Sequence, residues 1–82
     1  MSEPYLLDAR RLLCPLPVIR TQQRVRDLQP GDLLWVSASD PGVMQDIPAW
    51  CRVHGHQVLD RVVEGRDYRL LIEVGSRDFG AK

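Results

Sequence analysis

The sequence predicts an α/β fold of the two-layer sandwich type, in which two helices cover one face of a four-stranded mixed sheet. The predicted elements follow the order strand, helix, strand, helix, strand, strand (βαβαββ). Leu33–Ala38 is a nearly continuous apolar run of strand length. With 82 residues, the chain is too short to cover both faces of a sheet. Because 44% of the residues are hydrophobic, we expect one modest core and a single domain over residues 1–82.

Tyr5 to Asp8 is a short apolar stretch that predicts the first strand, and a loop follows it. From Pro17 onward, apolar or small residues recur at helical spacing and predict the first helix: Val18, Thr21, Val25 and Leu28. Proline is well accepted in the first turn of a helix, so the first helical residue is expected to be Pro15 or Pro17. Residues 29–32, with Pro30 and Gly31, predict a turn that ends this helix.

Leu33–Ala38 is predicted to be a central strand, with both faces covered or nearly so. Asp40 and Pro41 are typical of a helix start, with Asp40 as the cap and Pro41 at the first position. Pro48 is expected to kink or break this second helix, because proline removes a hydrogen bond and clashes with the preceding turn. Gly55 is a suitable left-handed end for the helix.

Gln57–Val63 and Tyr68–Val74 flank a turn at residues 64–67, and Tyr68–Val74 alternates between apolar and charged residues. This pattern predicts a hairpin with one solvated face. Gly75–Lys82 contains little apolar material, so we expect an ordered core of about residues 5–75 and a flexible tail at 76–82.

Eleven basic residues balance eleven acidic ones, so the chain lacks the positive excess that drives binding to nucleic acid or anionic lipid. We therefore expect protein or small-molecule partners. Residues 1–8 contain no apolar run long enough for a secretion signal or a membrane span. The sequence thus predicts a cytoplasmic protein, monomeric and not bound to a membrane, whose two cysteines are free thiols.

Cys14 directly precedes the first predicted helix. A helix start carries partial positive charge and unpaired amides, which stabilise a thiolate and can lower a cysteine pKa to about 3.5 to 7.5. Pro15 and Pro17 would form its structural flank, and the amides of Leu16 or Val18 would face the sulfur. An exposed thiolate can accept sulfane sulfur without a metal or organic cofactor. The alternative is a small hydrophobic residue that closes the end of a strand.

Several motifs between Leu6 and Val74 occur in an order that resembles a known family. They are Leu7-Asp8-Ala9, Cys14-Pro15-Leu16-Pro17, Gln29-Pro30-Gly31, and Asp40-Pro41 followed by Asp46-Ile47-Pro48 and Cys51. Because of these motifs, the chain resembles the TusA-like, or SirA-like, sulfur carriers with a CPxP motif. The resemblance implies a sulfurtransferase relay with a persulfide on Cys14. It further implies a cysteine desulfurase or rhodanese as donor and a downstream sulfur-relay protein as acceptor, for tRNA 2-thiouridine synthesis, molybdenum cofactor maturation or sulfur oxidation.

The chain departs from the family pattern at three positions. Arg11 stands where the family commonly has glycine, and Gln22 and Gln23 stand where it commonly has basic residues. Arginine resists the positive φ that glycine permits, so Arg11 implies a changed loop or a mildly strained one. The charge of Arg11 would also help to hold Cys14 as a thiolate.

The first third of the chain has a modest basic bias. As a functional interpretation, Arg11, Arg20 and Arg24 would form a docking surface for acidic partner proteins, in which complementary charge speeds encounter. The alternative is an ordinary solvated helix face.

The other candidate residues favour structural roles. Cys51 follows Trp50 in an apolar stretch and is expected to be buried and inert, or alternatively to act as a resolving partner for Cys14. Two histidines alone make an incomplete metal site, so no metal is predicted at His54 and His56. Three aspartates are interpreted as caps or turn residues: Asp8, Asp40 and Asp46.

Two other functions compete with sulfur transfer. The first is a non-catalytic regulatory module that binds protein or RNA, because similar small sandwiches have many functions. The second is a redox switch in which Cys14 and Cys51 form a reversible disulfide.

Overall fold

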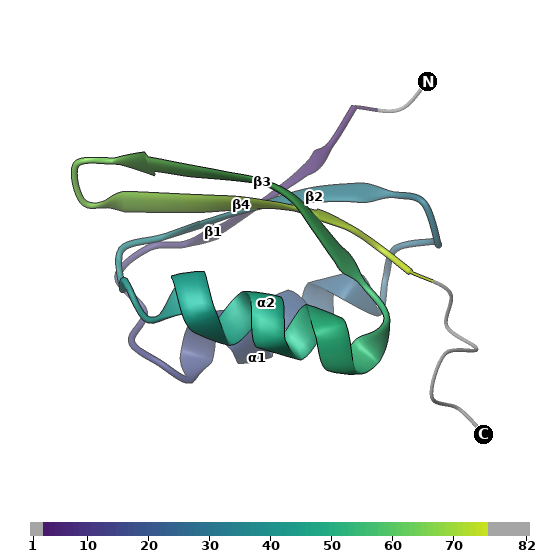
Figure 1. The fold of residues 1–82 in the computed structure, drawn as a ribbon, viewed down its shortest axis with the longest axis horizontal. Helices are drawn as coiled ribbons and strands as arrows, with labels where there is room; N and C mark the ends of the chain where they lie inside the picture. The colour runs from purple at the N-terminus through teal and green to yellow at the C-terminus, as the bar shows by residue number, and fades with distance from the viewer. Residues whose placement is uncertain (1–2, 76–82) are drawn as a thin grey trace.

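A computed structural model of the chain describes residues 3–75. Four strands form one sheet, and both helices pack on the same face of it (Figure 1). The two-layer sandwich and the βαβαββ order predicted from the sequence are therefore confirmed. The predicted flexible tail at residues 76–82 lies outside the described residues.

The six elements are β1 (Tyr5–Ala9), α1 (Leu16–Val25), β2 (Leu33–Ala38), α2 (Val43–His54), β3 (Gln57–Glu64) and β4 (Asp67–Glu73). The strand order in the sheet is β1-β2-β4-β3. β1 pairs parallel with β2, whereas β4 pairs antiparallel with both β2 and β3, so the sheet is mixed. Neither helix in the described part of the chain has the length and apolarity needed to span a membrane.

β2 occupies a central position, as predicted. Leu34, Val36 and Ala38 are buried on the helix-facing side, whereas Leu33, Trp35 and Ser37 are half-buried on the other side. Because both helices lie on one face, only that face of β2 is fully covered (Figure 1). The apolar residues of the outer face are instead partly shielded by neighbouring strands.

Helix α1 begins at Leu16, between the two prolines that were expected as its first residue. Pro15 occupies the N-cap with φ −94° and ψ 13°, outside the helical region, and the Cys14–Pro15 peptide bond is cis. Pro17 lies within the first turn, where its missing N–H is tolerated. The helix buries Pro17, Thr21 and Val25, and the Thr21 hydroxyl donates a hydrogen bond to the Pro17 carbonyl over 2.8 Å.

Helix α2 begins later than the sequence predicts. Its N-cap is Gly42, and Val43 is its first residue. Asp40 caps the preceding turn instead: its Oδ1 accepts the Gly42 amide at 2.9 Å, and its carbonyl accepts the Val43 amide at 3.1 Å. The prediction of Asp40 as helix cap and Pro41 as first helical residue is therefore displaced by two residues. Such a turn satisfies the amides that lead into the helix.

Of the kink or break predicted at Pro48, the break is wrong, because α2 runs without interruption from Val43 to His54. A proline inside a helix costs about 3 kcal/mol. Ile47 and Cys51, on either side of Pro48, are both buried in the core, and this packing offsets the lost hydrogen bond. The predicted left-handed end is confirmed, since Gly55 has φ 81° and the His56 amide bonds to the Cys51 carbonyl over 2.8 Å.

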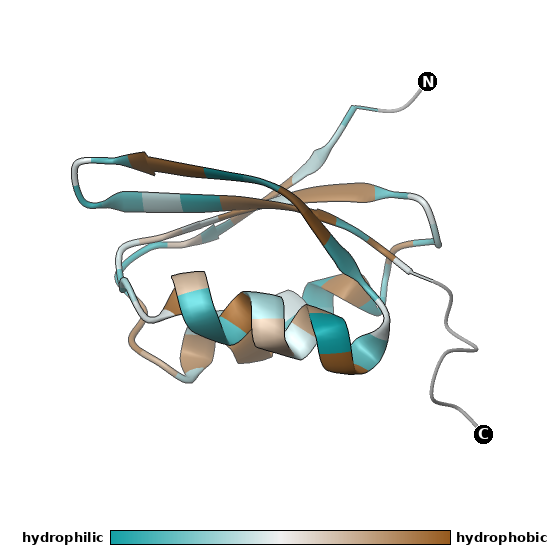
Figure 2. Ribbon diagram, in the orientation of Figure 1, coloured by the Kyte–Doolittle hydropathy of each residue, from teal (hydrophilic) through white to brown (hydrophobic). Residues whose placement is uncertain are grey.

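The predicted hairpin is also confirmed. β3 and β4 pair antiparallel from Gln57↔Glu73 to Glu64↔Asp67, with one irregularity between Val58 and Asp60. Both helices carry polar and apolar residues on different sides, and Figure 2 shows this for α2, which lies in front. Their apolar side chains meet one face of the sheet in a core of buried residues: Ala9, Val25, Leu28, Leu34, Val36, Ala38, Val43, Ile47, Cys51, Leu70, Ile72 and Val74.

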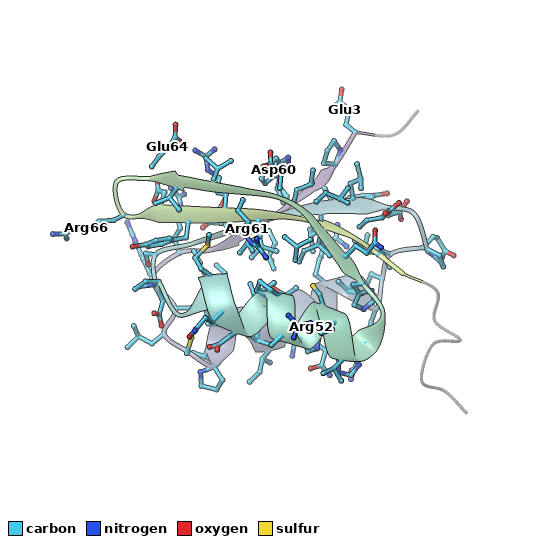
Figure 3. All side chains as sticks on the ribbon, viewed as in Figure 1. Glu3, Arg52, Asp60, Arg61, Glu64 and Arg66 are labelled. Atoms are coloured by element: carbon cyan, nitrogen blue, oxygen red, sulfur yellow. The ribbon has the colours of Figure 1, made fainter. Side chains whose placement is uncertain are left out.

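Within residues 3–75, no helix or strand covers the outer face of the sheet. Asp60 and Glu64 project from β3 away from the helices, whereas Arg52 projects from α2 on the other layer (Figure 3). Arg61, paired with the buried Leu70, faces the helix side of the sheet and lines a pocket of about 350 Å³ together with Arg52. The two faces of the hairpin therefore present different groups to solvent.

Candidate functional site

Cys14 lies in the loop between β1 and α1, beside the start of α2. Its backbone amide donates a hydrogen bond to Asp40 Oδ2 over 3.0 Å, and its thiol donates to Asp46 Oδ2 over 3.1 Å. The parallel pairing that places Ala9 opposite Ala38 brings the carboxyl ends of β1 and β2 to the same edge of the sheet. The loops that follow both strands therefore meet, and residues 26 and 32 positions apart in the sequence become neighbours.

Gly42 is closely packed against the Cys14 sulfur. A Cβ atom at position 42 would lie 3.1 Å from Cys14 Sγ, 3.3 Å from Asp40 Oδ1 and 3.7 Å from Asp46 Oδ2. The absence of a side chain at this N-cap position allows the sulfur and both carboxylates to pack together against the backbone of α2. Sequence reasoning did not identify this role for Gly42.

The Cys14 thiol is held in its protonated form. Its hydrogen bond to Asp46, partial burial and the nearby Asp40 carboxylate raise its pKa to about 12. The expectation that a helix start lowers this pKa is therefore wrong. The Leu16 amide bonds to the Leu13 carbonyl over 2.9 Å and so is committed within the loop, and two carboxylates dominate the surroundings of the sulfur.

Asp40 and Asp46 have different roles in this arrangement. The amides of Gly42 and Cys14 donate to Asp40, and these hydrogen bonds lower the pKa of its carboxyl group. Asp40 is therefore an ionised turn residue, in line with the structural role predicted for it. Asp46 lies in the first part of α2 and is exposed, and its Oδ2 accepts a hydrogen bond from the Cys14 thiol. The interpretation of Asp46 as a residue that only caps or turns the chain therefore missed this contact.

Arg11 adopts a left-handed backbone conformation with φ 72°. Its amide donates to Ser39 Oγ over 2.9 Å, so the loop keeps the conformation that glycine adopts more easily. Of the two outcomes expected at this position, the mildly strained loop is the one observed. Together with Asp8, Arg10, Ser39 and Asp67, Arg11 lines a pocket of about 490 Å³. Its guanidinium is not among the groups that shift the Cys14 pKa, so the predicted thiolate-stabilising effect is not found.

The two cysteines are both free, but they differ in accessibility. Cys14 is exposed, whereas Cys51 is only 1% exposed and belongs to the core. Burial raises the pKa of the Cys51 thiol to about 12. The prediction of Cys51 as a buried residue is confirmed, and this burial argues against its acting as a resolving partner for Cys14.

Three large apolar side chains within five residues of Cys14 in the sequence are exposed: Leu13 at 73%, Leu16 at 44% and Ile19 at 41%. Leu16 and Ile19 are three residues apart, so they lie on the same side of α1. Val18, by contrast, is partly buried and packs against the core. We call Leu13, Leu16 and Ile19 the apolar rim. The sequence indicated Leu16 only through its backbone amide and did not indicate an exposed apolar surface, although Leu16 and Ile19 fall outside the buried helical stripe.

The basic residues predicted as a docking surface differ in their exposure to solvent. Arg20 is exposed on α1. Arg24 is half-buried, and its guanidinium carbon lies 5.1 Å from the centroid of the Tyr5 ring. Arg24 therefore stabilises the contact between α1 and β1 in addition to contributing charge.

The two histidines at the end of α2 have packing roles. Trp50 contacts both rings, with centroid distances of 5.3 Å to His54 and 4.9 Å to His56. His56 Nδ1 also accepts the Gly75 amide over 2.9 Å. Within residues 3–75, no three His, Cys, Asp or Glu side chains are grouped as metal ligands.

The chain matches the family described as Sulfurtransferase TusA over residues 5–74. It is 36% identical over 75 residues to two proteins of Bacillus subtilis (strain 168), "Putative sulfur carrier protein YrkF" and "Putative sulfur carrier protein YrkI". The alignment covers 92% of this chain in both cases, and it spans 40% of the length of YrkF and 100% of YrkI.

A solved structure has the same fold. The crystal structure of a SirA-like protein from Desulfitobacterium hafniense superimposes with a TM-score of 0.76 and 22% sequence identity, over 88% of this chain and 99% of the other. The family match covers every strand and helix described above. In this chain, Cys14 lies where the loops after β1 and β2 meet. On the family match and the two relatives, the chain belongs to the TusA, or SirA-like, family of sulfur carriers.

Proposed function

We propose that this protein carries sulfane sulfur as a persulfide on Cys14 and passes it to a partner protein. The observation that supports this most directly is the contrast between the two thiols. Cys14 is exposed at the edge where two loops meet, whereas Cys51 is buried in the core. A protein partner can reach only an exposed sulfur. Because the chain belongs to a sulfur carrier family, the exposed thiol is the candidate to carry the transferred sulfur.

Sulfur acceptance would proceed by attack at sulfur. Cys14 Sγ would form a bond to the outer sulfur of a donor persulfide, and the S–S bond of the donor would break. The electron pair of that bond would go to the donor cysteine, which would also take the proton lost by Cys14. In the second step, an acceptor thiol would attack the outer sulfur on Cys14 in the same way. Neither step needs an oxidant, a reductant, a metal or an organic cofactor.

Donor and acceptor would both be proteins in this proposal. A cysteine desulfurase or rhodanese would supply the sulfur, and a downstream relay protein would receive it. The apolar rim beside Cys14 supports such docking, because apolar groups at the centre of an interface contribute most to binding. Arg20 and Arg24 on the same helix would add charge complementarity to an acidic partner. Synthesis of tRNA 2-thiouridine, molybdenum cofactor maturation and sulfur oxidation are the candidate pathways.

Mass spectrometry tests the proposal directly. The intact protein is incubated with a cysteine desulfurase and cysteine, and its mass is compared before and after. We expect the addition of one sulfur atom in the wild type and in Cys51→Ala, and no addition in Cys14→Ser. The absence of any adduct on the folded wild type, with several desulfurases and rhodaneses as donors, would reject the carrier function and leave the non-catalytic binding module.

A further inference from the structure

Asp46 is the side chain in direct contact with the reactive atom of Cys14. Its Oδ2 lies 3.1 Å from Cys14 Sγ, within the range of a hydrogen bond from a thiol. Both groups are exposed, so the pair is open to solvent and to a docking protein. Asp46 belongs to α2 and Cys14 to the β1–α1 loop, so this contact exists only because the two segments meet in the folded chain.

The surrounding backbone fixes this pair. Asp40 binds the amides of Cys14 and Gly42 through its two oxygens, which ties the Cys14 loop to the start of α2. Gly42 packs closely on one side of the sulfur, because a carbon atom added at that position would lie 3.1 Å from Cys14 Sγ. The thiol therefore donates to Asp46, and the backbone of Gly42 packs against one side of the sulfur.

The charged groups that influence Cys14 are both acidic. Asp40 approaches it from the β2–α2 loop and Asp46 from α2, and together with partial burial they raise the pKa of the thiol to about 12. Arg11, on the same loop as Cys14, lines the neighbouring pocket with Asp8 and Asp67 instead. At neutral pH, a thiol with a pKa raised to this extent is predominantly protonated. The free carrier thus exposes an accessible sulfur, mainly in the less nucleophilic thiol form.

We propose that Asp46 is a positioning residue that keeps the Cys14 thiol protonated and oriented in the free carrier, and that a partner protein activates the thiol by placing a cationic side chain against Asp46 and Asp40. This inference rests on the proposed function and defines the chemistry of the partner: an arginine or lysine next to its own sulfur-bearing or sulfur-accepting cysteine. The basic residues of α1 would meet acidic groups elsewhere on the same partner.

The activation step follows from electrostatics. A partner cation that pairs with Asp46 withdraws negative charge from the thiol and favours its ionised form. Cys14 Sγ then attacks the outer sulfur of the donor persulfide, and the donor cysteine leaves with the electron pair of the broken bond and takes the proton of Cys14. In the absence of a partner, the protonated thiol resists oxidation and stray alkylation, since both reactions require the thiolate. Reactivity would therefore be confined to the correct complex.

The first test measures the alkylation rate of Cys14 by iodoacetamide between pH 6 and 11. The proteins are the wild type, Asp46→Asn and the control Asp27→Asn, in which an exposed carboxylate two residues beyond the end of α1 is removed. Each unit by which the pKa falls gives tenfold more thiolate but about threefold lower intrinsic nucleophilicity. We therefore expect Asp46→Asn to react roughly 3- to 10-fold faster at pH 8 with a profile displaced to lower pH. Asp46→Glu should restore part of the wild-type profile, and Asp27→Asn should leave it unchanged.

The second test probes the charge at the site with two reagents of similar size, cationic aminoethyl methanethiosulfonate and anionic sulfonatoethyl methanethiosulfonate. The ratio of the cationic to the anionic rate should fall several-fold in Asp46→Asn, because the carboxylate that attracts the cation is gone. Asp27→Asn should keep the wild-type ratio. An equal ratio in wild type and Asp46→Asn would overturn the inference, as would coincident alkylation profiles.

A third measurement separates this inference from the proposed function. Sulfur loading from a cysteine desulfurase and cysteine is followed by mass for the same variants. The inference predicts opposite changes: Asp46→Asn reacts faster with iodoacetamide but acquires sulfur more slowly from the protein donor, because the contact with the donor's cation is lost. If the wild type acquires sulfur and Asp46→Asn acquires it at the same rate, the inference fails and the function stands. If no protein acquires sulfur, the function fails whatever the alkylation profiles show.

Discussion

The backbone amide of Arg11 donates a hydrogen bond to Ser39 Oγ, 2.9 Å away, and thereby joins the loop after β1 to the end of β2. This bond lies next to the Asp40 contact with the Cys14 amide, so two consecutive residues of one loop, Ser39 and Asp40, hold both ends of the segment from Arg11 to Cys14. Arg11 makes the bond with a φ of 72°, a conformation that disfavours residues with a side chain.

The stability of the loop should increase when the left-handed position is occupied by glycine. We expect Arg11→Gly to be more stable than Arg11→Ala by about 1 kcal/mol, because both lack the guanidinium but only alanine has a Cβ that disfavours positive φ. The midpoint of urea denaturation measures the difference. Equal midpoints for the two variants would show that the backbone at Arg11 is not strained.

The loss of folding stability at low pH should depend in part on Asp8. Hydrogen bonds from the Arg10 side chain and amide lower the pKa of Asp8 to about 2. Because the pKa is lower in the folded state, this contribution is present above about pH 4 and is lost as the pH falls toward 2. An NMR titration of the Asp8 carboxyl carbon should return this value, and Arg10→Gln should move it toward that of a free aspartate. Arg66→Gln, at the exposed hairpin turn, serves as the control; a shift there and none in Arg10→Gln would contradict the assignment.

A methyl group at position 42 should disturb the Cys14 site without directly altering its charge. The Cβ of Gly42→Ala would lie 3.1 Å from Cys14 Sγ, so the sulfur must move away from its acceptor on Asp46. We expect a lower Cys14 pKa and an alkylation rate at pH 8 that rises about threefold. Gln45→Ala, exposed in the same turn of α2, should leave the rate unchanged. If Gly42→Ala has the wild-type rate, the sulfur is less tightly packed than the structure indicates.

Charge reversal on α1 should affect encounter with a protein donor more than the chemistry of the thiol. Arg20→Glu is expected to slow sulfur loading from a desulfurase by about three- to tenfold at low salt, with a smaller effect at high salt. Its rate of alkylation should remain that of the wild type. Arg52→Glu, on the last turn of α2, provides the matched control. Equal loading rates for Arg20→Glu and Arg52→Glu would favour the ordinary solvated helix face.

The apolar rim should contribute to docking in the same way. Ile19→Asp places a charge in a surface that a partner would desolvate, so we expect loading from the protein donor to fall at least tenfold. Val53→Asp introduces the same charge at another exposed apolar residue, near the end of α2, which is 68% exposed compared with 41% for Ile19. The contact with the partner would have to lie elsewhere if both variants acquired sulfur at the same rate.

The sequence by itself determined the elements and their layers. The spacing of Val18, Thr21 and Val25 predicted the buried face of α1, and the apolar run at Leu33–Ala38 predicted the central strand, because local periodicity reports which side of an element is buried. It also indicated Cys14 as the candidate sulfur site, from its position before a helix and from the motifs around it. The errors were at the element boundaries and at Pro48, where packing of Ile47 and Cys51 overrides a local preference.

Only the tertiary structure decided the chemistry around the thiol. The sequence places Cys14 beside a helix start and therefore predicts a lowered pKa, whereas the fold brings Asp46 to 3.1 Å from the sulfur and raises that pKa to about 12. The carboxylate comes from a segment 32 residues away, and no periodicity or local motif encodes such a contact. The parallel pairing of β1 with β2 creates it, because it brings the two loops to one edge of the sheet.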